Sequence, residues 1–115
     1  RSAVEDFGGA QAYNSLKAAV INYAANLSQA LAPDGIRVNT VSPGVTLCKD
    51  GIWDQVRRQM PDVFDQTAAR VPLGQRFARP DEIARSIAFL ASPASAYTTG
   101  TNMVVDGGLT RRVQY

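Results

Sequence analysis

Tyr13 and Lys17 are the residues of this 115-residue sequence whose types and spacing could do chemistry. They lie four positions apart within residues 10–32, where Lys17 is the sole charged residue. In a helix, this spacing places both side chains on one face, near the helix start. A phenol is a weak base at neutral pH, but an adjacent ammonium group and the positive end of a helix both stabilise its anion. The pair therefore predicts a tyrosine that exchanges a proton with a substrate hydroxyl or carbonyl oxygen.

The same two residues also have a purely structural interpretation. A helical tyrosine is commonly a core residue whose hydroxyl has a partner, and a lysine is commonly a surface residue. Tyr-x-x-x-Lys also arises by chance in sequences of this length. The surrounding elements must therefore decide between the two interpretations.

Those elements follow an α/β order. The periodicity of apolar residues predicts a helix over 10–32 and then a strand over 36–41, which Ser42-Pro43-Gly44 ends. Two short helices are predicted over 52–60 and 61–69. A further helix begins at Pro80 and ends at Ser92-Pro93, and a last strand spans 102–106. A helix between two strands implies a parallel pair with a right-handed connection. Two short strands do not make a stable sheet, and they leave most of the first helix with nothing to pack against. We therefore expect an α/β fold that is incomplete by itself.

The apolar faces of two helices can be read from the same periods. On the helix over 10–32 this face is Tyr13, Leu16, Val20, Ala24, Leu27 and Leu31. On the helix that begins at Pro80 it is Ile83, Ile87, Ala88 and Ala91.

Composition excludes several classes of function. The chain is 45% hydrophobic and 19% charged, as a folded domain is, and its net charge of +2 favours neither nucleic-acid nor membrane binding. It has no His and a single cysteine, Cys48, so we expect no intrachain disulfide and no metal site. Cys48 is expected to fill space, because no His is present to activate it as a nucleophile. Without a membrane-spanning or signal segment, a soluble cytoplasmic protein is expected.

Four segments, in this order, resemble the short-chain dehydrogenase/reductase family over nearly the entire chain. They are AYNSLKAA at 12–19, GIRVNTVSPG at 35–44, PLG at 72–74 with RPDEIA at 79–84, and TG at 99–100 with VVDGG at 104–108. The resemblance implies that residues 1–115 are the C-terminal catalytic half of a Rossmann-like, doubly wound parallel sheet. The family's N-terminal dinucleotide-binding half, with its glycine loop, has no counterpart here. The start at Arg1 also suggests a piece of a longer protein.

The resemblance also assigns roles to residues. It implies that Tyr13 is the acid/base and that Lys17 binds the nicotinamide ribose and stabilises the tyrosinate, during hydride transfer between NAD or NADP and a carbonyl or secondary alcohol. Pro43, Gly44, Val45 and Thr46 match the turn that lies by the nicotinamide. Many members have a threonine where this chain has Cys48, so the hydroxyl contact comes from Thr46 or is absent. The family's catalytic serine and asparagine are expected upstream of Arg1, and Ser2 is not assigned to the site.

The segment over about 47–79 corresponds to the family's substrate loop. Its apolar residues Trp53, Val56, Met60 and Phe64 have approximate helical spacing, and either contact a small-molecule substrate or simply dock the loop. The family resemblance further implies a homodimer or homotetramer. The alternative is that this chain is a non-catalytic fragment, which acts only in assembly through exposed apolar faces.

Overall fold

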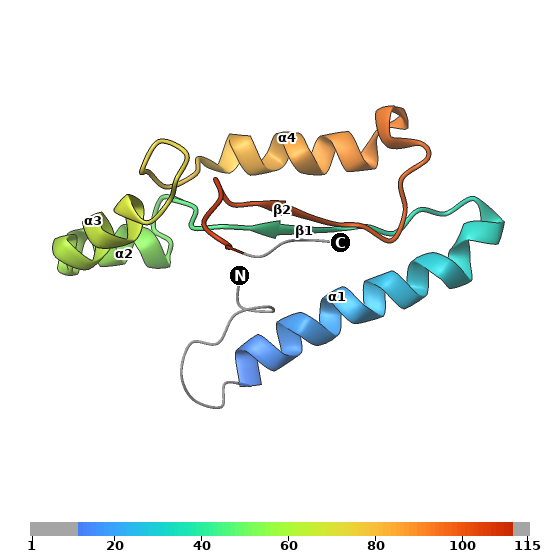
Figure 1. The fold of residues 1–115 in the computed structure, drawn as a ribbon, viewed down its shortest axis with the longest axis horizontal. Helices are drawn as coiled ribbons and strands as arrows, with labels where there is room; N and C mark the ends of the chain where they lie inside the picture. The colour runs from blue at the N-terminus through green and yellow to red at the C-terminus, as the bar shows by residue number, and fades with distance from the viewer. Residues whose placement is uncertain (1–11, 112–115) are drawn as a thin grey trace. The chain divides into compact units, whose positions relative to one another are not determined.

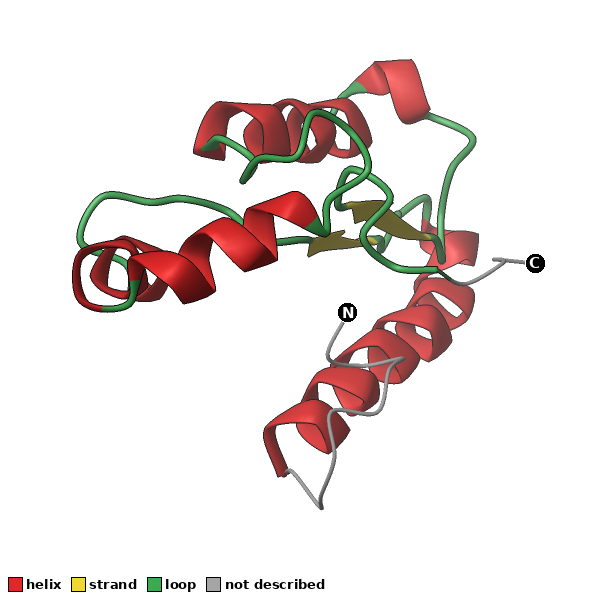
Figure 2. Ribbon diagram, turned by 60° about the vertical axis from the view of Figure 1, so that its left-hand side comes forward, coloured by secondary structure: helices red, strands yellow, loops and turns green. Residues whose placement is uncertain are grey.

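The computed structural model describes residues 12–111 (Figure 1). Ser2 and the first two positions of the helix predicted over 10–32 lie outside the described residues. The elements are, in order, α1 (Ala12–Leu31), the 3-10 turn η1 (Ala32–Asp34), β1 (Thr40–Pro43), α2 (Ile52–Gln59), α3 (Pro61–Ala69), α4 (Pro80–Ala91), the 3-10 turn η2 (Pro93–Ser95) and β2 (Asn102–Val105). Figure 2 shows the helices and the small sheet by colour. The α/β class predicted from the sequence is confirmed.

The chain divides into two compact units, which are described one at a time. Of the described residues, 12–42 with 87–103 form the first unit, and 43–86 with 104–111 form the second. Strands β1 and β2 make a two-stranded sheet. Its direction follows from two backbone bonds, Thr40 N–H to the Thr101 carbonyl and Gly44 N–H to the Val105 carbonyl, each 2.9 Å. Both bonds advance along the two strands together, so the pair is parallel, as predicted.

In the first unit, α1 ends as the sequence predicts. Gly35 takes a left-handed φ of 73° and donates its N–H to the Ala32 carbonyl at 2.9 Å. Glycine adopts this conformation without the steric cost that a Cβ would add. Further back on α1, the fully buried Ser28 faces Gly100, where an added Cβ would stand 2.7 Å from the Ser28 hydroxyl oxygen. The C-terminal half of α1 is therefore held through a contact between two small residues.

The strand predicted over 36–41 is wrong in its bounds, because β1 spans Thr40–Pro43. Before Thr40, the contacts with residues 98–101 are made largely by side chains, and one backbone bond joins the Gly100 N–H to the Val38 carbonyl at 2.8 Å. Asn39 donates to the Thr98 carbonyl at 3.0 Å and accepts from the Thr101 N–H at 3.1 Å. Pro43 was expected to lie beyond the end of the strand, and it is instead the last residue of β1. Since N–H groups alternate in direction along a strand and those of Thr40 and Gly44 point to β2, the Pro43 nitrogen faces the other side, where no β2 bond is lost.

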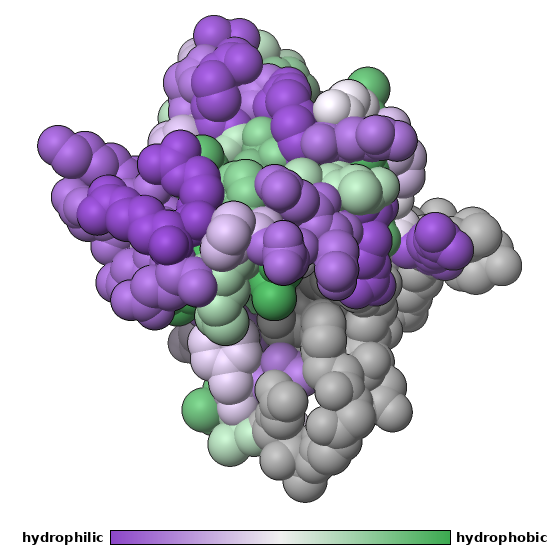
Figure 3. Space-filling view, turned by 90° about the vertical axis from the view of Figure 1, so that its left-hand side faces the viewer, coloured by the Kyte–Doolittle hydropathy of each residue, from purple (hydrophilic) through white to green (hydrophobic). Residues whose placement is uncertain are grey.

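The second unit contains the α2–α3 pair and most of α4. The two short helices begin and end within a residue of the predicted bounds. Its buried apolar side chains are Val71, Phe77, Ile83 and Leu109. Figure 3 shows that hydrophilic side chains cover most of the face that carries α2 and α3.

The apolar face predicted for α4 is wrong in part. Ile83 is buried as expected, but Ile87 is 51% exposed and Ala88 and Ala91 are also exposed. The buried positions on this helix are Ile83 and Leu90, seven residues apart and therefore two turns along one face. Ile87 lies to one side of the face that Ile83 and Leu90 define. The predicted helical period is therefore right, but the predicted apolar face is rotated about the helix axis relative to the buried one.

The N-terminal half of α1 leaves its apolar residues uncovered. Tyr13, Leu16 and Val20 are 61%, 67% and 59% exposed. Ala24, Leu27 and Leu31, further along the same face, are partly buried. This agrees with the expectation that two strands leave much of this helix without a packing partner.

Candidate active site

Tyr13 and Lys17 lie together in the first described turns of α1. The Lys17 ammonium nitrogen is 5.4 Å from the centroid of the Tyr13 ring, within the range of a cation–π contact. Both side chains are exposed, so a ligand can reach the phenol and the ammonium from one side of the helix. The structure therefore brings together the two residues that the sequence selected.

The turn over residues 43–46 lies in the second unit and begins at the last residue of β1. The Gly44 N–H bonds to the Val105 carbonyl, and the Thr46 hydroxyl donates to the Gly44 carbonyl at 3.2 Å. The Val45 carbonyl accepts the Ala78 N–H at 2.9 Å, and the Leu47 N–H donates to the Ala78 carbonyl at 3.0 Å. This turn is thus fixed on both flanks, which is a requirement for a rigid ligand-binding loop.

Gly44 is constrained by close packing. A Cβ at this position would stand 2.7 Å from both Cα and Cβ of Asp106, closer than atoms can approach. The Asp106 carboxylate accepts the Gly108 N–H at 2.9 Å and the Thr110 N–H at 2.8 Å. Burial raises the pKa of this carboxyl, but the hydrogen bonds from Thr110 and Gly108 outweigh it and leave the pKa lowered. The charged carboxylate of Asp106 therefore stabilises the turn after β2, which packs closely on Gly44.

Within residues 47–79, Trp53 and Phe64 both pack on Phe77. Phe64 stacks on the Phe77 ring with a centroid distance of 4.2 Å and an interplanar angle of 4°, and Trp53 lies tilted at 5.0 Å. Val56 is partly buried and Met60 is 49% exposed. Trp53 and Phe64 thus dock the two helices, and contact with a substrate stays a prediction for all four residues.

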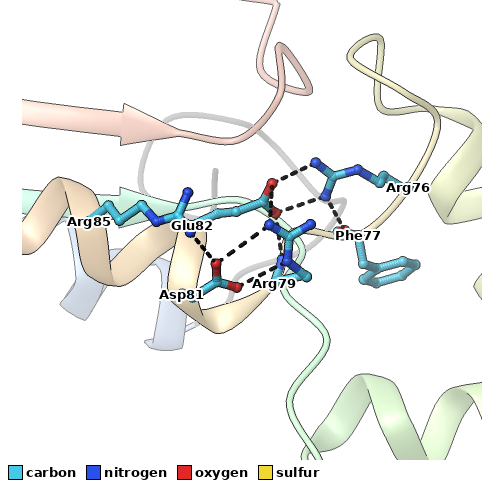
Figure 4. A network of polar contacts seen from close by, with 6 residues as sticks. All are labelled: Arg76, Phe77, Arg79, Asp81, Glu82 and Arg85. Atoms are coloured by element: carbon cyan, nitrogen blue, oxygen red, sulfur yellow. Dashed lines mark hydrogen bonds and ion pairs between the residues drawn. The ribbon is translucent and has the colours of Figure 1, made fainter.

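A network of charged side chains fixes the first turn of α4 (Figure 4). Arg76 donates to both carboxylate oxygens of Glu82, at 2.8 and 2.6 Å. The Arg79 N–H donates to the same carboxylate at 2.8 Å, which caps the helix start. These hydrogen bonds, that of Arg76 foremost, lower the pKa of Glu82 to about 2. Asp81 pairs with Arg79 at 3.0 Å and with Arg85 at 3.0 Å.

A second carboxylate, Asp54, stabilises the turn before α2. It is 2% exposed and accepts the Asp50 N–H at 3.0 Å while pairing with Arg57 and Arg58. The Asp50 N–H, chiefly, keeps the pKa of Asp54 below its usual value. Asp50 has a left-handed φ of 59°, a conformation that such a bond helps to hold. Cys48, at the start of this turn, is exposed, so the expectation that it fills space is wrong.

Two hollows in the surface do not fit a substrate site that includes Tyr13. One, of about 130 Å³, lies in the second unit between Val45, Ala78 and Asp106 and is smaller than the roughly 300 Å³ at which small-molecule sites begin. The other, of about 580 Å³, lies in the first unit between Ile36 and Thr98. It adjoins the C-terminal end of α1, whereas Tyr13 is near the other end of that helix.

Residues 12–111 hold no group of three or more His, Cys, Asp or Glu side chains placed to bind a metal ion. None of the described helices is long and apolar enough to cross a membrane.

Comparison with known proteins places the chain among oxidoreductases. A family described as enoyl-(acyl carrier protein) reductase matches residues 2–110. Isoepoxydon dehydrogenase patN of Aspergillus clavatus is 44% identical over 98 residues, which are 85% of this chain and 38% of that protein. The 3-oxoacyl-[acyl-carrier-protein] reductase FabG of Thermotoga maritima is 41% identical over 98 residues, covering 84% of this chain and 37% of its own length.

Solved structures agree with the sequence matches. A short chain dehydrogenase family protein from Francisella tularensis superposes with a TM-score of 0.82 at 31% identity, over 96% of this chain and 48% of that one. YwfH, an NADPH dependent reductase involved in bacilysin biosynthesis, gives a TM-score of 0.79 at 31% identity, over 93% of this chain and 43% of its own.

The fold and the matches define a Rossmann-fold oxidoreductase segment. The chain belongs to the short-chain dehydrogenase/reductase family, as its four sequence segments indicated. It spans 38% of the length of the first curated relatives, which are named dehydrogenases.

The sequence analysis did not select the charged residues that fix the loops around the candidate site. Arg76 was not selected, although its guanidinium joins the loop before α4 to that helix through two hydrogen bonds to Glu82. Glu82 entered the sequence analysis only as part of the segment RPDEIA. Asp54 was not selected, because an aspartate within a polar helix gives no sequence signal for burial.

Proposed function

We propose that this chain is the C-terminal catalytic part of a nicotinamide-dependent oxidoreductase, which transfers a hydride between the cofactor and a carbonyl or secondary alcohol. The observation that carries this proposal is the Tyr13–Lys17 pair, exposed on one face of α1 with the ammonium 5.4 Å from the ring centroid. Support comes from the matches over residues 2–110 to dehydrogenases and reductases.

The residues present fit such a cofactor. The exposed ammonium of Lys17 and the exposed phenol of Tyr13 can each hydrogen-bond to neighbouring hydroxyls of a sugar. The fixed backbone of the turn over residues 43–46 can hydrogen-bond to a planar amide. Tyr13 and Lys17 would bind the ribose, and Pro43, Gly44, Val45 and Thr46 would bind the carboxamide. When bound, the cofactor supplies the hydride for reduction or accepts it in oxidation. NAD and NADP stay equally open, although YwfH is described as NADPH dependent.

The chain's own residues handle the proton. In the reducing direction, the Tyr13 hydroxyl donates its proton to the substrate oxygen as the carbonyl carbon gains the hydride, and solvent then reprotonates the tyrosinate. The Lys17 ammonium, which lies against the same ring, would stabilise that tyrosinate, since a nearby opposite charge favours the anion. In the oxidising direction, the tyrosinate accepts the proton of the alcohol.

The substrate loop and the larger assembly complete the proposal. The segment over about 47–79 would cover the substrate, with Trp53, Val56, Met60 and Phe64 on it. The parent protein would be a cytoplasmic homodimer or homotetramer, which sedimentation of the full-length protein would test. The names of the relatives give no support to the alternative of a non-catalytic assembly fragment.

The test uses the full-length protein that contains this chain. It is assayed with NADH and NADPH against cyclohexanone, ethyl acetoacetate and diacetyl, and with the oxidised cofactors against the matching alcohols. We expect turnover with at least one pair, and a loss of about 10²- to 10⁴-fold in Tyr13→Phe with cofactor binding retained. Full activity in Tyr13→Phe would overturn the proposed mechanism.

A further inference from the structure

Arg76 links the loop before α4 to the first turn of that helix, in the second unit. It lies in the loop between α3 and α4, and its guanidinium grips the Glu82 carboxylate in the first turn of α4 with two bonds. The same guanidinium donates to the carbonyl of its neighbour Phe77 at 3.0 Å. Figure 4 shows the fork of Arg76 between Glu82 and this carbonyl. Arg76 thus fixes the backbone of Phe77 relative to α4.

Phe77 is the residue on which the α2–α3 pair rests. Its side chain is 6% exposed, and one aromatic ring from each helix, Trp53 from α2 and Phe64 from α3, packs on it. Aromatic pairs at such distances have a preferred geometry and so transmit the position of one ring to the next. Phe77 is therefore a contact that both helices share.

Glu82, the partner of Arg76 in α4, is itself held in place. Glu82 receives the Arg79 N–H as well as the Arg76 fork, so its carboxylate is held from two sides. Since the pKa of Glu82 is about 2, the carboxylate is charged at every pH at which an enzyme of this kind would work. Just beyond Phe77, Ala78 bonds to Val45 and Leu47 in both directions. Residues on both sides of Phe77 are thus fixed to elements outside the α2–α3 pair.

Stability accounts for only part of this arrangement. The Arg76 side chain is 48% exposed, and the charge attraction of an ion pair so open to solvent contributes modestly to the free energy of unfolding. A bidentate pair of hydrogen bonds also fixes direction as well as distance. The Arg76–Glu82 pair therefore supplies a defined geometry beyond its contribution to stability.

We propose that Arg76 is a positioning residue, which holds Phe77 through its carbonyl and so sets where the α2–α3 segment lies over the substrate. The inference rests on the proposed function, in which this segment covers the substrate. Arg76 acts through Phe77, and its removal alters the fit of the substrate more than the chemical step.

The experiment compares Arg76→Met, Arg76→Lys and the control Arg85→Met in the full-length enzyme. Arg85 is a suitable control because it is exposed and pairs with Asp81 on the same helix turn. The readouts are KM and kcat for the best ketone of the panel, and the ¹⁹F signal of 5-fluorotryptophan at position 53, assigned by its loss in Trp53→Phe. We expect Arg76→Met to raise the ketone KM about tenfold while kcat changes less than about threefold, and to shift the Trp53 signal.

Two further variants, Arg76→Lys and Glu82→Gln, distinguish a positioning role from a simple folding defect. Arg76→Lys retains the charge but not the fork, so it should restore part of the ketone KM. Glu82→Gln keeps the size of its side chain and should change KM in the same direction as Arg76→Met. If Arg76→Met does not fold, this second variant carries the test.

Two results would overturn the positioning role. One is an unchanged ketone KM and Trp53 signal in both Arg76→Met and Glu82→Gln, and the other is an equal effect in Arg85→Met. If Tyr13→Phe is inactive in the same assays, such a result removes the positioning role alone. Turnover of no ketone in the panel by the unmodified enzyme would overturn the proposed function, and this inference with it.

Discussion

The ammonium of Lys17 stands 5.4 Å from the ring centroid of Tyr13, one helical turn further along α1. Replacing Lys17 with Met removes this charge while keeping an unbranched side chain. We expect kcat/KM to fall by about 10²-fold or more, because the tyrosinate loses its counter-charge and the cofactor loses a ligand. Steady-state kinetics and a cofactor titration on the full-length protein measure the two losses separately. A variant with kcat/KM within twofold of the unmodified protein would show that Lys17 serves neither purpose.

Gly44 should tolerate no side chain. Its added Cβ would meet the Asp106 backbone at 2.7 Å, so Gly44→Ala must move the turn that is proposed to bind the nicotinamide. We expect a loss of about 1 to 3 kcal/mol in the free energy of unfolding and a cofactor Kd raised about tenfold. Gly35→Ala is the matched control, because its Cβ would meet no atom within 4 Å, although its φ of 73° is strained for alanine. A normal cofactor Kd in Gly44→Ala would contradict the placement of the cofactor at this turn.

Arg37 of the first unit should matter for stability more than the exposed Arg85 of the second unit. Its guanidinium donates to the carbonyls of Leu90, Ser92 and Thr98, and to the Ser95 hydroxyl, at 2.8 to 3.2 Å. These bonds add to those that the Ser95 hydroxyl donates to the carbonyls of Leu90 and Ser92 at the end of α4, where the helix leaves its last carbonyls without partners in the helix. We expect Arg37→Met to cost about 2 to 4 kcal/mol in urea unfolding. Arg85→Met, which removes an exposed pair, should cost less than about 1 kcal/mol, and equal costs would show that the Arg37 bonds are dispensable.

The contribution of Glu82 should depend on pH in a defined window. Its pKa falls from 4.5 to about 2 on folding, so ionised Glu82 stabilises the fold fully above about pH 4.5. As the pH falls toward 2, the carboxylate is protonated and this stabilisation is lost. The difference in unfolding midpoint between the unmodified protein and Glu82→Gln should therefore be constant above pH 4.5 and shrink below it. A difference that stays constant down to pH 2 would mean that the Arg76 and Arg79 contacts do not depend on the charge.

The sequence predicted the helices well, because proline and glycine mark their ends. Pro33 and Gly35 end α1, and Pro80 begins α4, each at the expected position. The strand β1 was displaced, since alternation cannot distinguish backbone pairing from the side-chain bonds that Arg37 and Asn39 make.

The candidate site was predictable where it depends on local spacing. Tyr13 and Lys17 are one helical turn apart, and their contact follows from the helix alone. The contact between Arg76 and Glu82 joins a loop to a helix, and the stacking on Phe77 joins three separate segments. Such contacts depend on the path of the chain, which no local pattern gives.

Single-turnover hydride transfer in the full-length protein tests the central claim most directly. Enzyme saturated with cofactor is mixed with substrate, and the rate of the nicotinamide absorbance change is compared in Tyr13→Phe and Tyr23→Phe. Tyr23 is a matched control, because it lies on the same helix and is 67% exposed, against 61% for Tyr13. We predict that Tyr13→Phe slows the step by about 10²- to 10⁴-fold while Tyr23→Phe leaves it within about threefold. Equal rates in the two variants would contradict the assignment of Tyr13 as the acid/base.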